Sequence, residues 1–465
     1  MHTGDIVELT IDSLELQGRG VARDAERGMV VFVERGLPGQ RVKALVGKVK
    51  ERFAEAEAVT VLDPAPHQVE PACPHFGPCG GCTWQDLAYA EQLVWKSRLV
   101  QDALGRLGGE TGKAAAGLVA SCIPSPLEYG YRNKMEFAFM PGNSHTPLYL
   151  GLRKRGSHEV IDVTHCKLMH PEAMAVLDQV RRWTAQSGLA AWDETTRTGC
   201  WRFCTLRQAD AAQGLPLQMF VQLITARHPD ADLAVAELTR VLKGLFPSVA
   251  AVVHHVRVSP VPLAQGEELR RHGGPLRLPM PLGDLVFHVS ADGFFQTNTQ
   301  GAVKLYETIR EMAGLTGTEK VLDLYCGSGG IALWLARHAA AVAGMDASAE
   351  AVRDAQKNAA ANKAVLGDVS VSFKAVNLRR GVEGAPFAPD VVVVDPPRGG
   401  MEPAVVDWLL KERPARIVAV SCNPATLARD LARLGEAYEV QAVQPVDMFP
   451  HTPHVEVAAR LVRLG

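Results

Sequence analysis

The residues most suited to chemistry begin with Cys422, in the stretch I-V-A-V-S-C-N-P over residues 417–424. The apolar run predicts a strand buried on both faces of a parallel sheet. Asn423 is suited to cap a following helix, and Pro424 to occupy its first position. Cys422 then faces the positive end of a helix dipole, which lowers the pKa of a thiol and favours a reactive thiolate. The alternative is a buried cysteine that packs as a small apolar side chain.

Three aspartates follow or lie within other apolar runs of the same third of the chain. Asp323 stands in V-L-D-L before Y-C-G-S-G-G, whose glycines allow a ligand to approach the backbone closely. The predicted strand 341–345 ends in Asp346, where Rossmann-like folds place a carboxylate for ribose hydroxyls. The predicted strand 391–394 ends in Asp395. Because carboxyl ends of parallel strands share one edge, these aspartates and Cys422 indicate a nucleotide site there. The nicotinamide fingerprint G-x-G-x-x-G is absent.

A second chemical group is formed by Cys73, Cys79 and Cys82, spaced C-x5-C-x2-C among glycines and prolines. These turn-forming residues bend the backbone enough to direct several thiolates to one centre. Cys166 is the best candidate for a fourth ligand. Three close cysteines with one remote partner favour an iron–sulfur cube, with zinc and unliganded thiols as alternatives.

The elements that must position these groups predict a multi-domain α/β protein. Short β-branched runs between glycine-rich turns indicate an OB-like five-stranded barrel over residues 1–62. Residues 63–289 are predicted to form a central α+β domain that carries the cysteine site, with a helix over 87–107. Its basic strands predict either an RNA-binding sheet or a merely solvated one. Residues 290–465 are predicted to form a Rossmann-like domain. The predicted barrel is rich in basic residues, which are Arg19, Arg23, Arg41, Lys43, Lys48, Lys50 and Arg52.

Composition restricts the function classes. The 465 residues carry a formal net charge of −2, so RNA binding requires local basic patches. Nine cysteines and a start without a basic, apolar signal segment favour a reducing cytoplasm. Charges interrupt the apolar stretches, so a membrane span is not expected.

Several motifs together resemble those of bacterial RNA uracil-5 methyltransferases. The resemblance covers nearly the whole chain. Residues 18–23 with 32–33 look like a TRAM domain, a module of RNA-modifying enzymes. Because the cluster-bearing members act on 23S ribosomal RNA, the chain is most similar to those enzymes. The motifs are D-P-P-R at 395–398, S-C-N-P at 421–424, F-Q-T-N at 295–298, D-M-F-P-H-T-P-H-V-E at 447–456 and the C-x5-C-x2-C group.

The resemblance implies a role for each matching residue. Cys422 is the expected nucleophile and Glu456 the expected base. S-adenosylmethionine is expected to be surrounded by Gln296, Tyr325, Gly330, Asp346, Asn377 and Asp395. A [4Fe-4S] cluster is expected on Cys73, Cys79, Cys82 and Cys166. The chain departs from the family pattern at three positions, where Asp346 replaces glutamate, Asn377 aspartate and Gly330 asparagine.

The implied chemistry explains these residue types. Thiolate addition at carbon 6 of uracil makes carbon 5 nucleophilic, and a base must later remove the carbon 5 proton. The target base must leave the RNA stack to reach the site. The expected protein is a monomer with an RNA partner. Alternatives are the same chemistry on tRNA, adenine-N6 methylation, and an RNA-binding iron–sulfur protein without catalysis. Adenine-N6 chemistry expects an aromatic residue where Arg398 stands.

Overall fold

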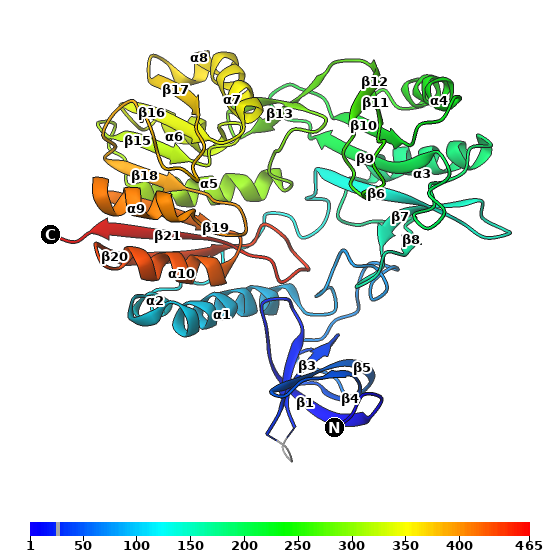
Figure 1. The fold of residues 1–465 in the computed structure, drawn as a ribbon, viewed down its shortest axis with the longest axis horizontal. Coiled ribbons are helices and arrows are strands. Elements are labelled where there is room, and N and C mark those ends of the chain that lie inside the picture. Colours follow the sequence, from blue (N-terminus) through cyan, green and yellow to red (C-terminus); the bar gives the residue numbers. More distant parts are fainter. Residues whose placement is uncertain (25–27) are drawn as a thin grey trace.

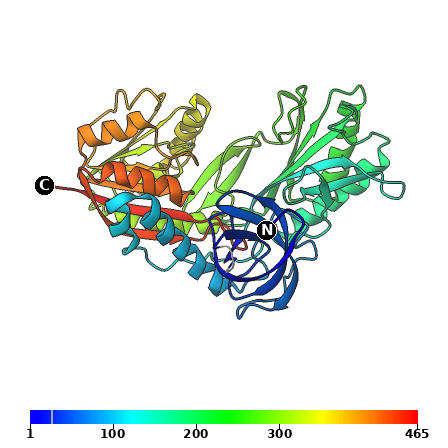
Figure 2. The ribbon, with the colours of Figure 1, turned by 60° about the horizontal axis from the view of Figure 1, so that its bottom comes forward.

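The computed structural model describes residues 1–24 and 28–465. The chain forms a small barrel and two seven-stranded sheets, with a two-stranded hairpin between the sheets. In Figure 1 the barrel lies below, the C-terminal sheet to the left and the central sheet to the right. Figure 2 brings the barrel forward, in front of the gap between the two larger parts.

The N-terminal barrel is closed, as the sequence predicted. Its strand order is β1-β2-β3-β5-β4. Alternating side chains such as Ile11, Val33 and Val42 fill the interior, because successive residues of a strand point to opposite faces. Part of its basic surface is neutralised, since Arg19 pairs with Glu15 and Arg41 with Asp63. The strands are β1 (Ile6–Leu14), β2 (Gly20–Arg23), β3 (Val30–Glu34), β4 (Arg41–Val49) and β5 (Phe53–Asp63).

Two helices connect the barrel to the rest of the chain. The helix expected over 87–107 is α1 (Tyr89–Leu107), which is followed by α2 (Gly109–Ala116). Val100 and Leu104 of α1 pack into the core of the C-terminal sheet beside α10. Trp95 and Leu99 share a smaller core with Leu14 of the barrel. Figure 1 shows both helices beneath that sheet, so α1 connects the barrel to the C-terminal sheet.

The central sheet has the order β12-β11-β10-β9-β6-β7-β8, with β10 and β11 parallel and the other pairs antiparallel. Helices α3 and α4 pack on one face through a core that includes Phe137, Leu206 and Leu238. The elements are β6 (Lys134–Pro141), β7 (Leu148–Arg153), β8 (Val160–Asp162), α3 (Pro171–Gln186), β9 (Trp201–Ala209), β10 (Gln218–Thr225), α4 (Ala231–Leu245), β11 (Val249–Val256) and β12 (Glu268–Gly273).

A hairpin of β13 (Arg277–Leu282) and β14 (Leu285–Ser290) joins the two sheets. Its apolar side chains, among them Met280 and Phe287, share one core with Phe220 of the central sheet and Leu333 of the C-terminal part. Through this shared core, the hairpin holds the central sheet and the C-terminal sheet together.

The C-terminal sheet has the order β17-β16-β15-β18-β19-β21-β20. Among these strands, β21 is antiparallel to its neighbours β19 and β20, and the other neighbouring pairs are parallel. The predicted strand 391–394 is β18 (Val391–Val394), whose residues are all buried. Helices cover both faces, the arrangement predicted for a Rossmann-like domain. The remaining elements are α5 (Thr299–Ala313), β15 (Lys320–Leu324), α6 (Gly330–Ala336), β16 (Ala341–Asp346), α7 (Ala349–Ala361), α8 (Lys363–Leu366), β17 (Ser370–Ala375), α9 (Pro403–Glu412), β19 (Arg416–Ser421), α10 (Pro424–Leu434), β20 (Tyr438–Val446) and β21 (Glu456–Arg463).

Candidate active site

A cavity of about 1050 Å³ opens at the carboxyl ends of β15, β16, β18 and β19. Open α/β sheets bind ligands at this edge because the loops that follow the strands diverge there. The structure brings together all eight residues that the sequence nominated for catalysis or cofactor binding. They are Gln296, Tyr325, Gly330, Asp346, Asn377, Asp395, Cys422 and Glu456.

Cys422 and Glu456 reach the cavity from neighbouring strands. β21 runs antiparallel to β19, and Ser421 pairs with Val457 in their register. The residue after Ser421 and the residue before Val457 therefore lie at the same edge of the sheet. Asn423 caps α10 as predicted, since its Oδ1 accepts a hydrogen bond from the Ala425 N–H at 3.1 Å.

The expected lowering of the Cys422 pKa is wrong for the ligand-free protein. Burial raises the pKa of the thiol to about 11, and the charges of Glu456 and Asp395 add to the rise. Arg398 opposes it. A helix terminus contributes only about 0.3–1 kcal/mol, less than one pKa unit, so burial outweighs it. The thiol is protonated at neutral pH and must lose its proton when substrate binds.

Three carboxyl groups stand close to one another at the cavity. Burial, together with Asp395, raises the pKa of Glu456 well above its ordinary value. Burial also raises the pKa of Asp395 to about 6. The Asp323 pKa is raised well above normal by burial and by Asp395, although its Oδ2 accepts a hydrogen bond from the Ala332 N–H. Such a wall favours a ligand with positive charge.

The glycine-rich turn after β15 has an unusual backbone. Tyr325, Gly327 and Gly329 have φ values of 66°, 53° and 89°. A left-handed tyrosine is strained by about 1–3 kcal/mol, and such strain gathers at functional sites. The Gly327 N–H donates to Asp346 Oδ2 at 2.9 Å, which fixes this carboxylate against the turn. The Tyr325 hydroxyl accepts a hydrogen bond from the Glu402 N–H at 3.1 Å.

The segment before α5 is held by the central sheet. Asn133 donates to the Gln296 carbonyl at 2.8 Å, and Arg207 donates to the Gly293 carbonyl at 2.5 Å. Gln222 donates to Asp292 at 2.7 Å. The central sheet therefore positions one wall of the cavity, the wall that carries Gln296. Asn377 lies exposed at another wall, where its side chain accepts a hydrogen bond from the Arg379 N–H.

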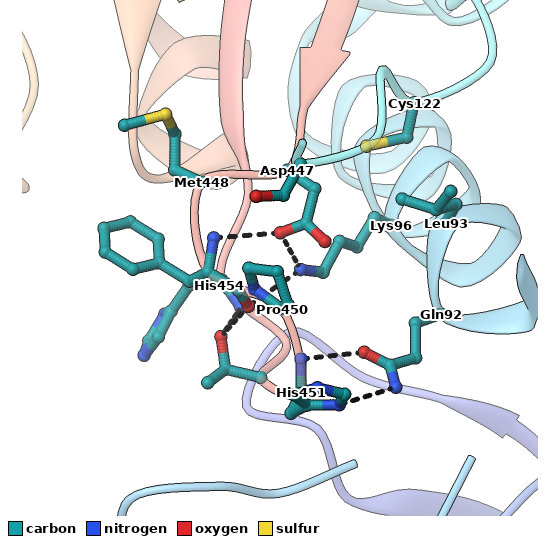
Figure 3. A network of polar contacts seen from close by, with 12 residues as sticks. Gln92, Leu93, Lys96, Cys122, Asp447, Met448, Pro450, His451 and His454 are labelled. Atoms are coloured by element: carbon teal, nitrogen blue, oxygen red, sulfur yellow. Dashed lines mark hydrogen bonds and ion pairs between the residues drawn. The ribbon is translucent and has the colours of Figure 1, made fainter. Parts of the chain in front are cut away.

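The segment between β20 and β21 is held from the other side by α1. Lys96 Nζ lies 2.5 Å from Asp447 Oδ1, and both side chains are fully buried. Tyr89 donates to Asp447 Oδ2 at 2.9 Å, and the Gln92 side chain accepts from the His451 N–H at 2.8 Å. Figure 3 shows Lys96 and Gln92 reaching from their helix to this segment. The segment leads directly into Glu456, so α1 fixes the start of β21.

The four cysteines of the second group are also brought together. Cys73, Cys79, Cys82 and Cys166 line one small cavity of about 20 Å³. The Gly81 N–H donates to Cys79 Sγ at 3.4 Å, and Gln85 donates to Cys82 Sγ at 3.2 Å. Four thiols are the donor set of an iron–sulfur cube. Within residues 1–24 and 28–465, no group of three or more histidine, cysteine or acidic side chains has the arrangement of a metal site.

Asp323, which the sequence also predicted at this edge, lines the cavity, together with residues for which no role was predicted. Arg398 and His454 occur in the quoted motifs, and their side chains lie 3.4 Å apart. Burial and the Arg398 charge lower the pKa of His454 to about 4. Tyr306 of α5 lines the cavity as well. Phe294 is 70% exposed at the same cavity. In the sequence, Phe294 directly precedes F-Q-T-N, and this position was the signal that could have identified it.

The parallel sheet, the glycine turn and the acidic residue at the end of β16 define a Rossmann-like enzyme for a nucleoside-containing cofactor. The family described as tRNA (uracil-5-)-methyltransferase matches residues 277–464, and the TRAM domain matches residues 2–59. A relative from Nitratidesulfovibrio vulgaris, described as an uncharacterized RNA methyltransferase, is 44% identical over 98% of this chain and 96% of its own. Another, from Halalkalibacterium halodurans, is 35% identical over 99% of this chain and 98% of its own.

A solved structure resembles the whole chain. The Pyrococcus abyssi tRNA (uracil-54, C5)-methyltransferase in complex with S-adenosyl-L-homocysteine has a TM-score of 0.76 and 27% identity. The likeness covers 98% of this chain and 99% of that one. The chain belongs to the RNA uracil-5 methyltransferase family and is an S-adenosylmethionine-dependent enzyme. Among the helices of the described residues, none is both long and apolar enough to cross a bilayer.

Proposed function

We propose that this enzyme methylates carbon 5 of a uridine in 23S ribosomal RNA through a covalent bond to Cys422. The Cys422 thiol gives up its proton to solvent, its sulfur adds to carbon 6, and the electron pair of the 5,6 double bond moves into the ring as an enolate. Carbon 5 then takes the methyl group that S-adenosylmethionine supplies. Glu456 removes the carbon 5 proton, the carbon–sulfur bond breaks, and 5-methyluridine leaves.

The observation that carries this proposal is the arrangement of Cys422, Glu456 and Asp395 at one cavity. The two carboxylates raise the thiol pKa, so the three groups are close enough to interact electrically. Burial keeps the proton affinity of Glu456 high, which suits a base that acts on carbon. Asp346 and the turn from Tyr325 to Gly330 lie where a cofactor ribose and methionine would be held.

Two of the three departures from the family pattern keep a polar side chain in place. Asp346 is shorter than glutamate and is drawn to the turn by the Gly327 N–H. Asn377 presents an amide at the cavity in place of a carboxylate. We expect Gln296, Tyr325, Gly330, Asp346, Asn377 and Asp395 to surround S-adenosylmethionine.

The test uses RNA that contains 5-fluorouridine. Fluorine at carbon 5 cannot leave as a proton, so the adduct cannot resolve and a protein–RNA band persists on a denaturing gel. The band is expected with S-adenosylmethionine and wild-type enzyme, and it should vanish in Cys422→Ala. Cys200→Ala is the matched control, because Cys200 is a buried cysteine outside the cavity. Wild-type enzyme that methylates RNA without forming the band would contradict the covalent route.

The same assay decides between RNA classes. The Pyrococcus abyssi structure is that of a tRNA enzyme by its title, which makes tRNA the second candidate substrate. The cysteine group and the barrel favour 23S ribosomal RNA through the family resemblance. We expect the adduct with 23S fragments and not with tRNA transcripts. The reverse outcome would reassign the substrate.

We also propose that Cys73, Cys79, Cys82 and Cys166 bind a [4Fe-4S] cluster. Support comes from four thiols around one cavity and from N–H groups that donate to two of the sulfurs. Anaerobically purified protein should contain close to four irons per chain, and less in Cys79→Ser. Zinc without iron would favour the alternative site.

We propose the division 1–62, 63–289 and 290–465, with the barrel as a phosphate-binding module. Lys43, Lys48 and Lys50 are exposed on or next to β4. Each phosphate contact releases counterions, so charge reversal should weaken rRNA binding and flatten its salt dependence. Lys48→Glu with Lys50→Glu tests this by filter binding at several salt concentrations. An unchanged slope would contradict this role of the barrel.

A further inference from the structure

Tyr306 occupies a fixed position in the wall of the cavity beside Gly330. Its side chain is 6% exposed and lines the cavity. The ring meets the indole of Trp334 edge-on, with ring centroids 5.9 Å apart and planes at 66°. Packing on a buried indole restricts the ring, so the hydroxyl has one place in the cavity wall.

The absence of a side chain at position 330 is explained by this tyrosine. Gly330 begins α6 and is not among the glycines with positive φ, so its backbone does not require glycine. A Cβ atom at position 330 would lie 2.5 Å from the Tyr306 hydroxyl oxygen and 3.2 Å from Cζ. The Tyr306 hydroxyl thus fills the space into which a side chain at position 330 would extend.

The hydroxyl stands among acidic groups and remains a donor. Burial raises the pKa of Tyr306, and Asp395, Asp323 and Glu456 raise it further. The phenol therefore keeps its proton over the whole working pH range. Within the described residues, no protein group forms a hydrogen bond with this hydroxyl. A donor that lines the cavity and has no protein partner is available to a bound ligand.

We propose that the Tyr306 O–H donates a hydrogen bond to the methionine carboxylate of S-adenosylmethionine, and so replaces a side chain at position 330. This inference rests on the proposed cofactor site. The sulfonium and ammonium groups of the cofactor suit the carboxyls of this wall, whereas its carboxylate finds no partner in them. That carboxylate needs a neutral or positive donor, and Tyr306 supplies one at the wall next to the glycine turn.

The experiment measures binding of S-adenosyl-L-homocysteine to the full chain by calorimetry, without RNA. Tyr306→Phe keeps the ring against Trp334 and removes the hydroxyl. A hydrogen bond to a charged group is worth enough for a loss of roughly 10- to 100-fold in affinity. 5′-Methylthioadenosine, which lacks the amino-acid part, should bind wild type and variant equally. Equal affinity for S-adenosyl-L-homocysteine, or equal losses for both ligands, would overturn the proposal.

Two further variants separate a local contact from general damage. Tyr438→Phe removes another buried hydroxyl, which bonds to the carbonyls of Leu409 and Pro414 outside the cavity. It should leave the affinity for S-adenosyl-L-homocysteine unchanged. Wild-type protein that binds neither ligand would refute the cofactor site itself, and not only the role of Tyr306.

The pairing of positions 306 and 330 gives an independent check. Gly330→Ala should weaken binding because the new methyl group displaces the hydroxyl. Tyr306→Leu opens the space, so Gly330→Asn in that background should recover affinity through its amide. Unchanged affinity in Gly330→Ala, or no recovery in the double variant, would contradict the exchange of roles between the two positions.

Discussion

Two buried carboxyl groups stand at the two ends of the segment 447–456, and their surroundings differ. Asp447 accepts hydrogen bonds from Lys96, Tyr89 and the Phe449 N–H. Glu456 faces the cavity, and none of the described groups donates a hydrogen bond to it. A paired carboxylate holds structure, whereas a buried unpaired one has a raised pKa and can take a proton. One short segment therefore carries an anchor, Asp447, and the proposed base, Glu456.

The largest effect is expected from a variant that removes the proposed base, Glu456, and keeps the anchor, Asp447. Glu456→Gln preserves the shape of the side chain, so the sulfur should add and the methyl group transfer. Loss of a general base costs about 10²- to 10⁴-fold, so release should stall and a methylated protein–RNA adduct should accumulate. A denaturing gel with methyl-labelled cofactor measures this. Free methylated RNA at the wild-type rate would assign the base elsewhere.

The next largest effect is expected from a variant that removes the cation paired with Asp447 and keeps the proposed base. Lys96→Met leaves Asp447 as a buried charge without its cation, which typically costs about 3–5 kcal/mol of unfolding free energy. Urea unfolding measures the loss. Lys96→Met with Asp447→Asn removes the stranded charge and should regain part of it. A single variant as stable as wild type would show that the pair contributes little.

A pH series sharpens the contrast through Asp395. Its folded pKa of about 6 lies above the ordinary value of 3.8, so the folded state prefers the protonated carboxyl. This contribution is present below pH 4 and is lost as pH rises through about 6, on the order of 3 kcal/mol. Asp395→Asn should be more stable than wild type at pH 7.5 and equal to it below pH 4. Thermal unfolding at both values measures the difference, and a constant gap would contradict the raised pKa.

The smallest effect tests whether the anchor tolerates loss of a neutral donor. Tyr89→Phe removes the hydroxyl that donates to Asp447 and accepts from the Ser125 N–H. The expected loss is about 1 kcal/mol of stability, because the Lys96 contact remains. Methylation under saturating substrate should stay within about twofold of wild type. A loss as large as that of Lys96→Met would make the whole network cooperative.

Local patterns predicted much of this architecture. The valines of β18 and the Asn423–Pro424 pair before α10 carry their signals within a few residues, and the structure confirms both elements. The convergence of Asp323, Asp346 and Cys422 followed from parallel strands sharing an edge. The raised pKa of Cys422 was missed because burial depends on residues far away in the sequence, and a strand end reveals only the helix that follows it.

The Lys96–Asp447 contact was beyond such patterns for the same reason. Lys96 sits on an amphipathic helix, where a lysine ordinarily reads as a solvated residue. The partner lies 351 positions later, and no periodicity connects them. Tyr306 was missed differently, since an aromatic at helical spacing is typical of a core. Its hydroxyl became notable only through the empty position at Gly330.

The distance between Lys96 and Asp447 along the chain also sets an order of events during synthesis. A ribosome needs roughly 20–70 s to add the intervening 351 residues at about 5–20 residues per second. The barrel strands, Ile6 to Asp63, can close early because their pairings are local. In helix α1, Lys96 lacks its carboxylate partner until segment 447–456 has been made, and Val100 and Leu104 lack the C-terminal core on which they pack. A nascent chain that stops before residue 447 cannot form the Lys96–Asp447 contact, so this buried pair is among the last contacts of the fold to become possible.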